Sequence, residues 1–244
     1  KSEQNSMQKN INKKRFKQKL EEVLLQENEF PNSTIDSQRI INNLKKITDG
    51  KDFLDVGAGY GFFSNEAQKA KFNVRALELN SSVRDIFKLL NNFEAENINF
   101  DEEFVKINNQ KFDIVLLSQV LEHIPLKLNP IKNIYNTLKP NGICVIAVPH
   151  FGSTFSILQG KKDMFIDPPE HVNFFSINGL NNIFKRNGFE LVKLETVSRA
   201  NKKKIASRFK IFSLIINPAL TLFIKLSDKI NKGMYIQAYY KKLM

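Results

Sequence analysis

The feature that most constrains this chain is a run of alternating glycines in the sequence KDFLDVGAGYGFF, residues 51–63. A short apolar stretch, FLDV, precedes the glycines and is typical of a buried strand, and a helical pattern follows them. A strand, a glycine turn and a helix in this order place the turn at the carboxyl edge of a parallel sheet. The missing Cβ atoms let the backbone approach a ligand closely there. The sequence therefore predicts an α/β protein with a ligand site at that edge.

The rest of the chain alternates in the same way. Further strands are expected in NVRALEL, NINF, FDIVLLS, ICVIAVP, FELVKLETV and MYIQAYYKK, and helices over 63–71, 82–92, 130–139 and 176–185. Such alternation predicts a seven-stranded, mostly parallel sheet with helices on both faces. Two helical patterns precede it. We therefore expect an N-terminal helical extension over 1–49 and one domain over 50–244.

Two segments interrupt the alternation. Residues 150–175 form a long stretch rich in glycine, proline and aromatic residues, which predicts a lid. Residues 199–232 form an apolar helical insert before the last strand, and Pro218 is expected to split it. Its apolar core of 14 residues is shorter than the ~20 that a membrane span needs. Residues 199–244 hold eleven basic residues and one acid, so peripheral contact with an anionic membrane and a homodimer through 205–230 both stay open.

Two known patterns compete for the glycine turn. The dinucleotide fingerprint G-x-G-x-x-G requires a glycine at position 62, where this chain has Phe62. The pattern D/E-x-G-x-G-x-G is matched at every position by Asp55, Gly57, Gly59 and Gly61. The chain also has an acid, Glu78, at the end of RALE, and the turn LKPNG. With these motifs it resembles the class I S-adenosylmethionine-dependent methyltransferases from about residue 50 to 198. The resemblance implies a Rossmann-like fold, S-adenosylmethionine as the cofactor and S-adenosylhomocysteine as its product.

The resemblance also implies which residues hold the cofactor. The methionine part would lie on the acid and backbone of the turn, at Asp55, Gly57, Ala58, Gly59 and Gly61. Glu78, followed by Leu79, would bind the ribose, because a carboxylate accepts two hydroxyl hydrogen bonds. Asp101 would face the adenine, and Ser118 and Gln119 would line the methyl-donor pocket.

The three histidines are the candidate bases, since methylation of a hydroxyl also removes a proton. His171, in DPPEHVNFF, is the first choice; His150, after the fifth strand, and His123 are the others. Gln119, Glu122 and His123 are expected to share one helical face. In the ubiquinone-biosynthesis branch of the family this position can hold a divalent metal. No metal is predicted here, because Gln119 stands where a second carboxylate would help.

These features favour a methyltransferase of a small molecule, with O-methylation of a sugar or cell-surface glycan precursor first. A lipid-linked or quinone precursor at the membrane surface is an alternative, and a non-catalytic S-adenosylmethionine-binding protein is another. Nucleic acid is not expected as a partner, because the fourth strand ends in LLSQVLEH without the N/D-P-P-Y/F/W pattern of base methylation. The composition fits a bacterial protein. The single Cys144 and the polar start predict a cytoplasmic location, or a peripheral one at the inner membrane face.

Overall fold

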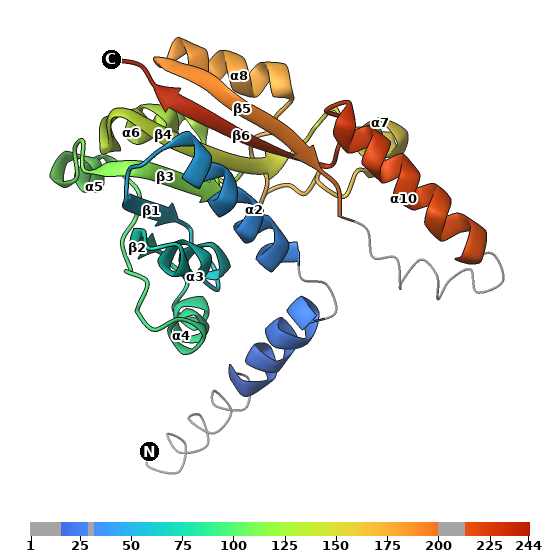
Figure 1. Cartoon of the computed structure of the whole chain (residues 1–244), viewed down its shortest axis with the longest axis horizontal. Helices are drawn as coiled ribbons and strands as arrows, with labels where there is room; N and C mark the ends of the chain where they lie inside the picture. Colours follow the sequence, from blue (N-terminus) through green and yellow to red (C-terminus); the bar gives the residue numbers. More distant parts are fainter. Residues whose placement is uncertain (1–15, 29–31, 200–212) are drawn as a thin grey trace.

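A computed structural model describes residues 16–28, 32–199 and 213–244, and it is built around one mixed sheet (Figure 1). The six strands are β1 (Asp52–Val56), β2 (Asn73–Leu77), β3 (Phe112–Ser118), β4 (Leu138–Pro149), β5 (Phe189–Val197) and β6 (Tyr235–Lys242). Their spatial order is β2-β1-β3-β4-β6-β5. β2, β1, β3 and β4 are parallel neighbours, and β6 runs antiparallel to both β4 and β5. The α/β fold class expected from the alternation is confirmed.

The expected count of seven strands is wrong, because NINF forms no strand. Next to β2 the chain makes only one parallel bridge, between Leu77 and Glu96. The Glu96 carboxylate accepts hydrogen bonds from Arg75 at 2.6 and 2.8 Å. The backbone then turns away from the sheet, because Asp101 caps the helix α5 (Glu102–Ile107). The four residues between the bridge and this cap form no further pairing with the sheet.

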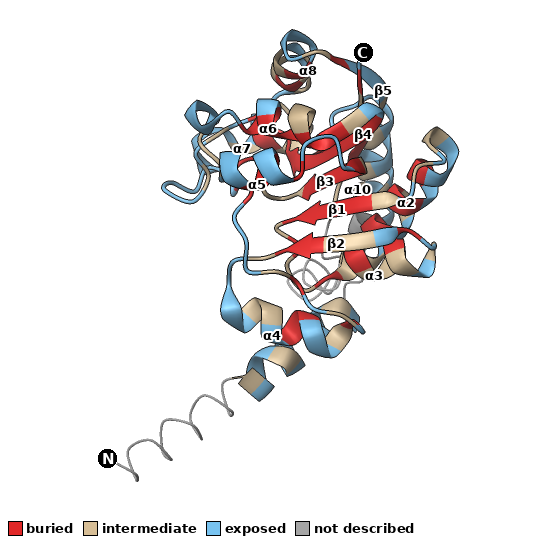
Figure 2. Cartoon of the chain, turned by 90° about the vertical axis from the view of Figure 1, so that its left-hand side faces the viewer, coloured by how far each residue is buried: buried red, intermediate tan, exposed pale blue. Residues whose placement is uncertain are grey.

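Helices cover both faces of the sheet, as the sequence predicted. One face carries α2 (Asn32–Ile47) and α3 (Phe62–Lys69), and the other carries α6 (Pro130–Thr137) and α8 (Ile177–Arg186). A further helix, α4 (Ser81–Leu90), packs through Phe87 against β2 and the glycine turn. Figure 2 shows the central strands buried between these layers. Because α2 contributes Ile40, Ile41 and Leu44 to the core, the segment before residue 50 is packed on the sheet.

Both interrupting segments contain helices where they are described. The expected lid contains α7 (Thr154–Gln159) and a 3₁₀ turn, η2 (Gly160–Lys162); a second turn, η1 (Leu126–Leu128), precedes α6. The insert contains α10 (Ser213–Lys229), and residues 200–212 lie outside the described part. Pro218 lies inside α10, so the expectation that it splits the segment is wrong: a proline removes one helical hydrogen bond and a helix can continue past it. The rings of Phe155 and Phe223 join α7 to α10 at 5.5 Å between centroids.

Candidate functional site

The glycine turn between β1 and α3 opens toward empty space. Gly59 has a φ of +56°, and a Cβ added there would meet no atom within 4 Å. Gly61 has a φ of +84°, but its Cβ would lie 2.6 Å from Cε2 of Phe87. Gly59 therefore keeps space free in front of the turn, whereas Gly61 permits close packing against α4.

Two carboxylates flank the turn and have different environments. Glu78 Oε2 accepts a hydrogen bond from the backbone nitrogen of Gly59 at 3.0 Å, and Oε1 accepts one from Asn80 N at 2.8 Å. Asp55 is fully buried, and its Oδ2 accepts a hydrogen bond from Ser64 Oγ at 2.7 Å. Burial raises the pKa of Asp55 to about 7. Glu78 thus fastens the turn at the mouth of the site, while Asp55 lies beneath it.

Two cavities meet at the glycine turn. The first, of about 170 Å³, is lined by Val56, Gly57, Leu77, Glu78, Leu79, Ile98, Asn99, Phe100, Val120 and Ile124. The second, of about 190 Å³, is lined by Ser33, Asp55, Gly57, Ala58, Gly59, Tyr60, Phe62, Phe63, Ser118, Gln119 and Arg199. Gly57 lines both. Eight of the ten residues that the sequence predicted for the cofactor line one cavity or the other; we call the second one the donor cavity.

The other two predicted residues, Gly61 and Asp101, lie outside both cavities. The Asp101 carboxylate accepts hydrogen bonds from the backbone of Glu103 and Phe104, each at 3.1 Å, as the cap of α5. Asn99 and Phe100 line the cavity that contains Glu78 instead. The sequence pattern did not reveal these two neighbours, because NINF is typical of a strand.

The segment after β3 forms a sharp turn and not a helix. The prediction that Gln119, Glu122 and His123 share one helical face is therefore wrong. Gln119 has a φ of +57°, and its side-chain Nε2 donates to the Ala147 carbonyl at 3.1 Å. Glu122, by contrast, is buried, and neither of its carboxylate oxygens has a hydrogen-bond partner. Burial raises the pKa of Glu122 to about 7. The turn therefore separates Gln119 from Glu122 and directs the acid inward.

Glu122 forms a cluster with two of the candidate bases. The rings of His123 and His171 lie 4.9 Å apart, and one ligand atom from each of the three residues lies within 4.8 Å of the others. His123 Nδ1 contacts the Glu170 carbonyl and His171 Nδ1 the Phe165 carbonyl, each at 2.8 Å. Since a carbonyl only accepts, each Nδ1 carries the proton and each Nε2 has a lone pair. Such a cluster can move a proton, and its nitrogen and oxygen atoms suit a divalent metal.

His150 lies apart from this cluster. It is buried at the end of β4, where its Nδ1 donates to the Gly233 carbonyl at 2.9 Å. Burial lowers the pKa of His150. This environment favours a neutral imidazole that ties β4 to the start of β6.

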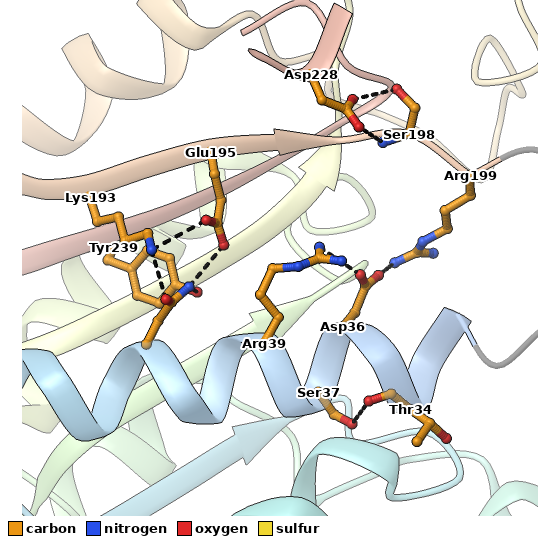
Figure 3. Close-up of polar contacts among 11 residues, drawn as sticks. Thr34, Asp36, Ser37, Arg39, Lys193, Glu195, Ser198, Arg199, Asp228 and Tyr239 are labelled. Atoms are coloured by element: carbon orange, nitrogen blue, oxygen red, sulfur yellow. Dashed lines mark hydrogen bonds and ion pairs between the residues drawn. The ribbon is translucent and has the colours of Figure 1, made fainter. Parts of the chain in front are cut away.

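A residue that sequence reasoning missed, Arg199, reaches the donor cavity from the end of β5. Its guanidinium pairs with Asp36 of α2, which also accepts a hydrogen bond from Arg39 at 2.9 Å (Figure 3). The guanidinium carbon lies 4.4 Å from the centre of the Tyr235 ring. Nothing in the local sequence distinguishes Arg199 from the basic residues that follow it.

Comparison with known proteins places this geometry among methyltransferases. The profile of a family described as "Methyltransferase domain" matches residues 32–194. A ubiquinone biosynthesis O-methyltransferase from Coxiella burnetii is 34% identical over 96 residues, which cover 38% of this chain and 41% of that protein. The chain thus spans less than half of the length of this curated relative.

Two solved structures illustrate the fold. A crystal structure of a SAM-dependent methyltransferase from Archaeoglobus fulgidus superimposes with a TM-score of 0.63 at 18% identity, covering 90% of this chain and 99% of that one. The [4+2]-cyclase SpnF superimposes with a TM-score of 0.56 at 16% identity, covering 85% and 81%. At these identities the likeness shows the fold alone.

Proposed function

Because the chain belongs to the methyltransferase-domain family, we propose that it transfers a methyl group from S-adenosylmethionine to a hydroxyl of a small molecule. The observation that carries this proposal is the pair of cavities meeting at Gly57. The adenosine part of the donor would occupy the cavity with Glu78 and Phe100, and its methionine part the donor cavity. The sulfonium is already activated, so the protein's main work is to exclude water and align the acceptor.

His171 is the proposed base for the acceptor hydroxyl. Its Nδ1–H is held by the Phe165 carbonyl, so Nε2 is the atom that takes the proton. The buried Glu122, with a pKa raised to about 7, lies beside it to stabilise the imidazolium or receive the proton in turn. In this proposal the cluster moves protons and holds no metal.

A sugar or glycan precursor is the first proposed acceptor. Polar and aromatic groups both lie beside the donor cavity, among them Arg199 and the ring of Tyr235. Aromatic faces and polar hydrogen-bonding groups together suit a hydroxylated ring.

Methyl transfer itself is tested with tritium-labelled S-adenosylmethionine and metabolite extracts from cells that lack the gene. Label should pass from the donor into a small-molecule fraction, and S-adenosylhomocysteine should accumulate in equal amount. Donor binding without any transfer would instead favour a non-catalytic S-adenosylmethionine-binding protein. A protein that binds no donor would contradict the proposal.

A lipid-linked or quinone precursor is the second proposed acceptor, and one surface favours it. We define the α7–α10 surface by its exposed apolar side chains, Ile157, Leu158, Leu222, Leu226 and Ile230. Exposed lysines 161, 162, 225, 229 and 232 surround it, whereas the nearest acids in the sequence, Asp163 and Asp228, are buried and partly buried. Apolar groups ringed by positive charge suit an anionic lipid surface. Within the described residues, no helix has the length and apolarity needed to cross a bilayer.

Vesicle sedimentation tests that surface. The protein should sediment with phosphatidylglycerol vesicles and not with phosphatidylcholine vesicles. Leu158→Asp with Leu226→Asp should abolish sedimentation, while Leu89→Asp, an equally exposed site on α4, should not. If light scattering shows a dimer that the double variant dissociates, the surface is a contact between copies and not a lipid-binding face.

A further inference from the structure

Four side chains, one of which lines the donor cavity, carry buried polar atoms that have no hydrogen-bond partner. Among the described residues, six such atoms belong to Glu122, Asp163, Arg199 and Gln237, and only Asn91 adds another. Buried polar groups in folded proteins are nearly always paired, because an unpaired one destabilises the folded state. A group of them in one region therefore indicates a bound partner that satisfies them.

Tyr235 connects three of these residues. The Arg199 guanidinium lies over its ring, and the Phe165 ring meets it at 5.2 Å between centroids. The backbone nitrogen of Phe165 in turn donates to Asp163 Oδ1 at 3.1 Å, which leaves Oδ2 unpaired. Glu122 is linked to the same ring through His171, which lies beside it and donates from Nδ1 to the Phe165 carbonyl at 2.8 Å. Four segments therefore meet at this ring: the lid, the end of β5, the start of β6 and the turn after β3.

Gln237 extends the group toward the donor cavity. It lies two residues beyond Tyr235 on β6, so both side chains are on the same face of the sheet. Its partner across the ladder to β4 is Ala147, whose carbonyl accepts hydrogen bonds from the backbone and the side chain of Gln119. Gln237 is only 1% exposed, and both its amide oxygen and its amide nitrogen lack partners.

The unpaired atoms include both donors and acceptors. Glu122 and the Gln237 oxygen accept, while the Gln237 nitrogen and Arg199 Nε donate. An apolar group would leave all of them unpaired, and a purely anionic or purely cationic group would be repelled by one of the charged members. A hydroxyl donates and accepts at once. We propose that Glu122, Arg199 and Gln237 form an acceptor subsite that binds several hydroxyl groups, so that the acceptor is polyhydroxylated and carbohydrate-like.

This inference rests on the proposed function and specifies its substrate. The ring of Phe165 from the lid lies against the ring of Tyr235 from β6, beside these residues. We expect the ring of the acceptor to lie against these aromatic side chains, which would keep water from the reacting hydroxyl.

The experiment compares wild type with Gln237→Leu, which removes both unpaired amide atoms at similar volume. Transfer of labelled methyl is measured to myo-inositol, methyl glucoside and UDP-glucose, and to 3,4-dihydroxybenzoate as a planar catechol. Wild type should methylate at least one of the three polyols. Gln237→Leu should lower kcat/KM for that polyol about 10–100-fold, the range expected for lost hydrogen bonds to a substrate. It should also raise the melting temperature and leave S-adenosylhomocysteine affinity within about twofold.

Asn108→Leu is the matched control. This buried amide is fully paired, to Arg75 and to the Phe104 carbonyl, so its loss should lower the melting temperature without changing transfer. Gln237→Met serves as a second variant if the leucine variant does not fold. Unchanged kinetics in a folded Gln237 variant would mean that ordered water fills the subsite, and the inference would be wrong. Transfer to the catechol alone, or to none of the three polyols, would also overturn it. Catechol methylation would leave the proposed function intact, whereas a protein that binds no donor would contradict that function itself.

Discussion

Glu78 accepts a hydrogen bond from the backbone nitrogen of Gly59 at 3.0 Å, across the 19 residues that separate the end of β2 from the glycine turn. This bond fixes the turn from the neighbouring strand. The same carboxylate lines the cavity that would receive the adenosine part of the donor. The Glu78 side chain therefore holds the glycine turn in place and is positioned to accept hydrogen bonds from the ribose hydroxyls.

Removal of the Glu78 carboxylate should weaken donor binding. Glu78→Ala loses charge-assisted hydrogen bonds worth about 1.5–3 kcal/mol, so calorimetry with S-adenosylhomocysteine should show roughly 10–100-fold lower affinity. Glu78→Gln keeps one amide oxygen for Gly59 N and should lose less. The melting temperature should change little, because Glu78 is only half-buried. If Glu78→Ala and wild type bind S-adenosylhomocysteine with equal affinity, Glu78 does not contact the donor.

His171→Ala should lower turnover by about 10²–10⁴-fold and leave donor affinity nearly intact, because the imidazole acts only on the acceptor proton. His150→Ala is the comparison, and its loss should be smaller, since His150 is bonded to Gly233 away from the cluster. The wild-type rate should fall at low pH, where the base is protonated, and His171→Ala should lose this acidic limb of the pH–rate profile. Full activity of His171→Ala across the pH range would assign proton removal to His123 or to solvent.

Stability should fall as the pH rises from about 4 to 7. Burial raises the pKa of both Asp55 and Glu122 to about 7, whereas the unfolded chain has ordinary carboxyl values of 3.8 and 4.5. In that window the folded state binds more protons, so the free energy of unfolding decreases with pH, by about 1.4 kcal/mol for each unit of each shift. Denaturant titrations at pH 5 and 8 measure the difference. Glu122→Gln should reduce it, and a stability that rises with pH would refute these protonation states.

A chelator should leave methyl transfer unchanged, because we assign proton transfer rather than metal binding to Glu122, His123 and His171. The measurement is the initial rate before and after dialysis against EDTA, with magnesium, manganese or zinc then restored. A rate that EDTA abolishes and one of these ions restores would make the cluster a metal site.

Much of the fold follows from local pattern. A helix was expected over 176–185, and α8 begins there, with Ser176 Oγ accepting a hydrogen bond from the backbone nitrogen of Gly179. The glycine turn and the apolar strands were found because period and turn chemistry are local properties. NINF forms no strand: the chain bridges β2 only at Glu96 and enters α5 at the Asp101 cap.

The site was predictable only where a motif lies on one continuous segment. Arg199 lines the donor cavity, and Gln237 pairs with Ala147 next to Gln119, through the antiparallel pairing of β4, β6 and β5. No local pattern reveals this pairing. The burial of Glu122 depends on a left-handed Gln119, which converts an expected helix into a turn. Site residues that the sheet topology brings together could therefore not be predicted from the sequence, whereas those that lie on one continuous segment could.

The central claim is that the glycine turn holds S-adenosylmethionine, and calorimetry on wild type and Gly59→Val tests it most directly. A Cβ at Gly59 meets no protein atom, so the valine side chain would occupy the ligand's space, although the φ of +56° also strains it. Wild type should bind one S-adenosylhomocysteine and bind nicotinamide dinucleotides more weakly. Gly59→Val should retain its circular dichroism spectrum and lose S-adenosylhomocysteine binding. Unchanged affinity in the variant, or tighter binding of a nicotinamide dinucleotide by wild type, would contradict the account.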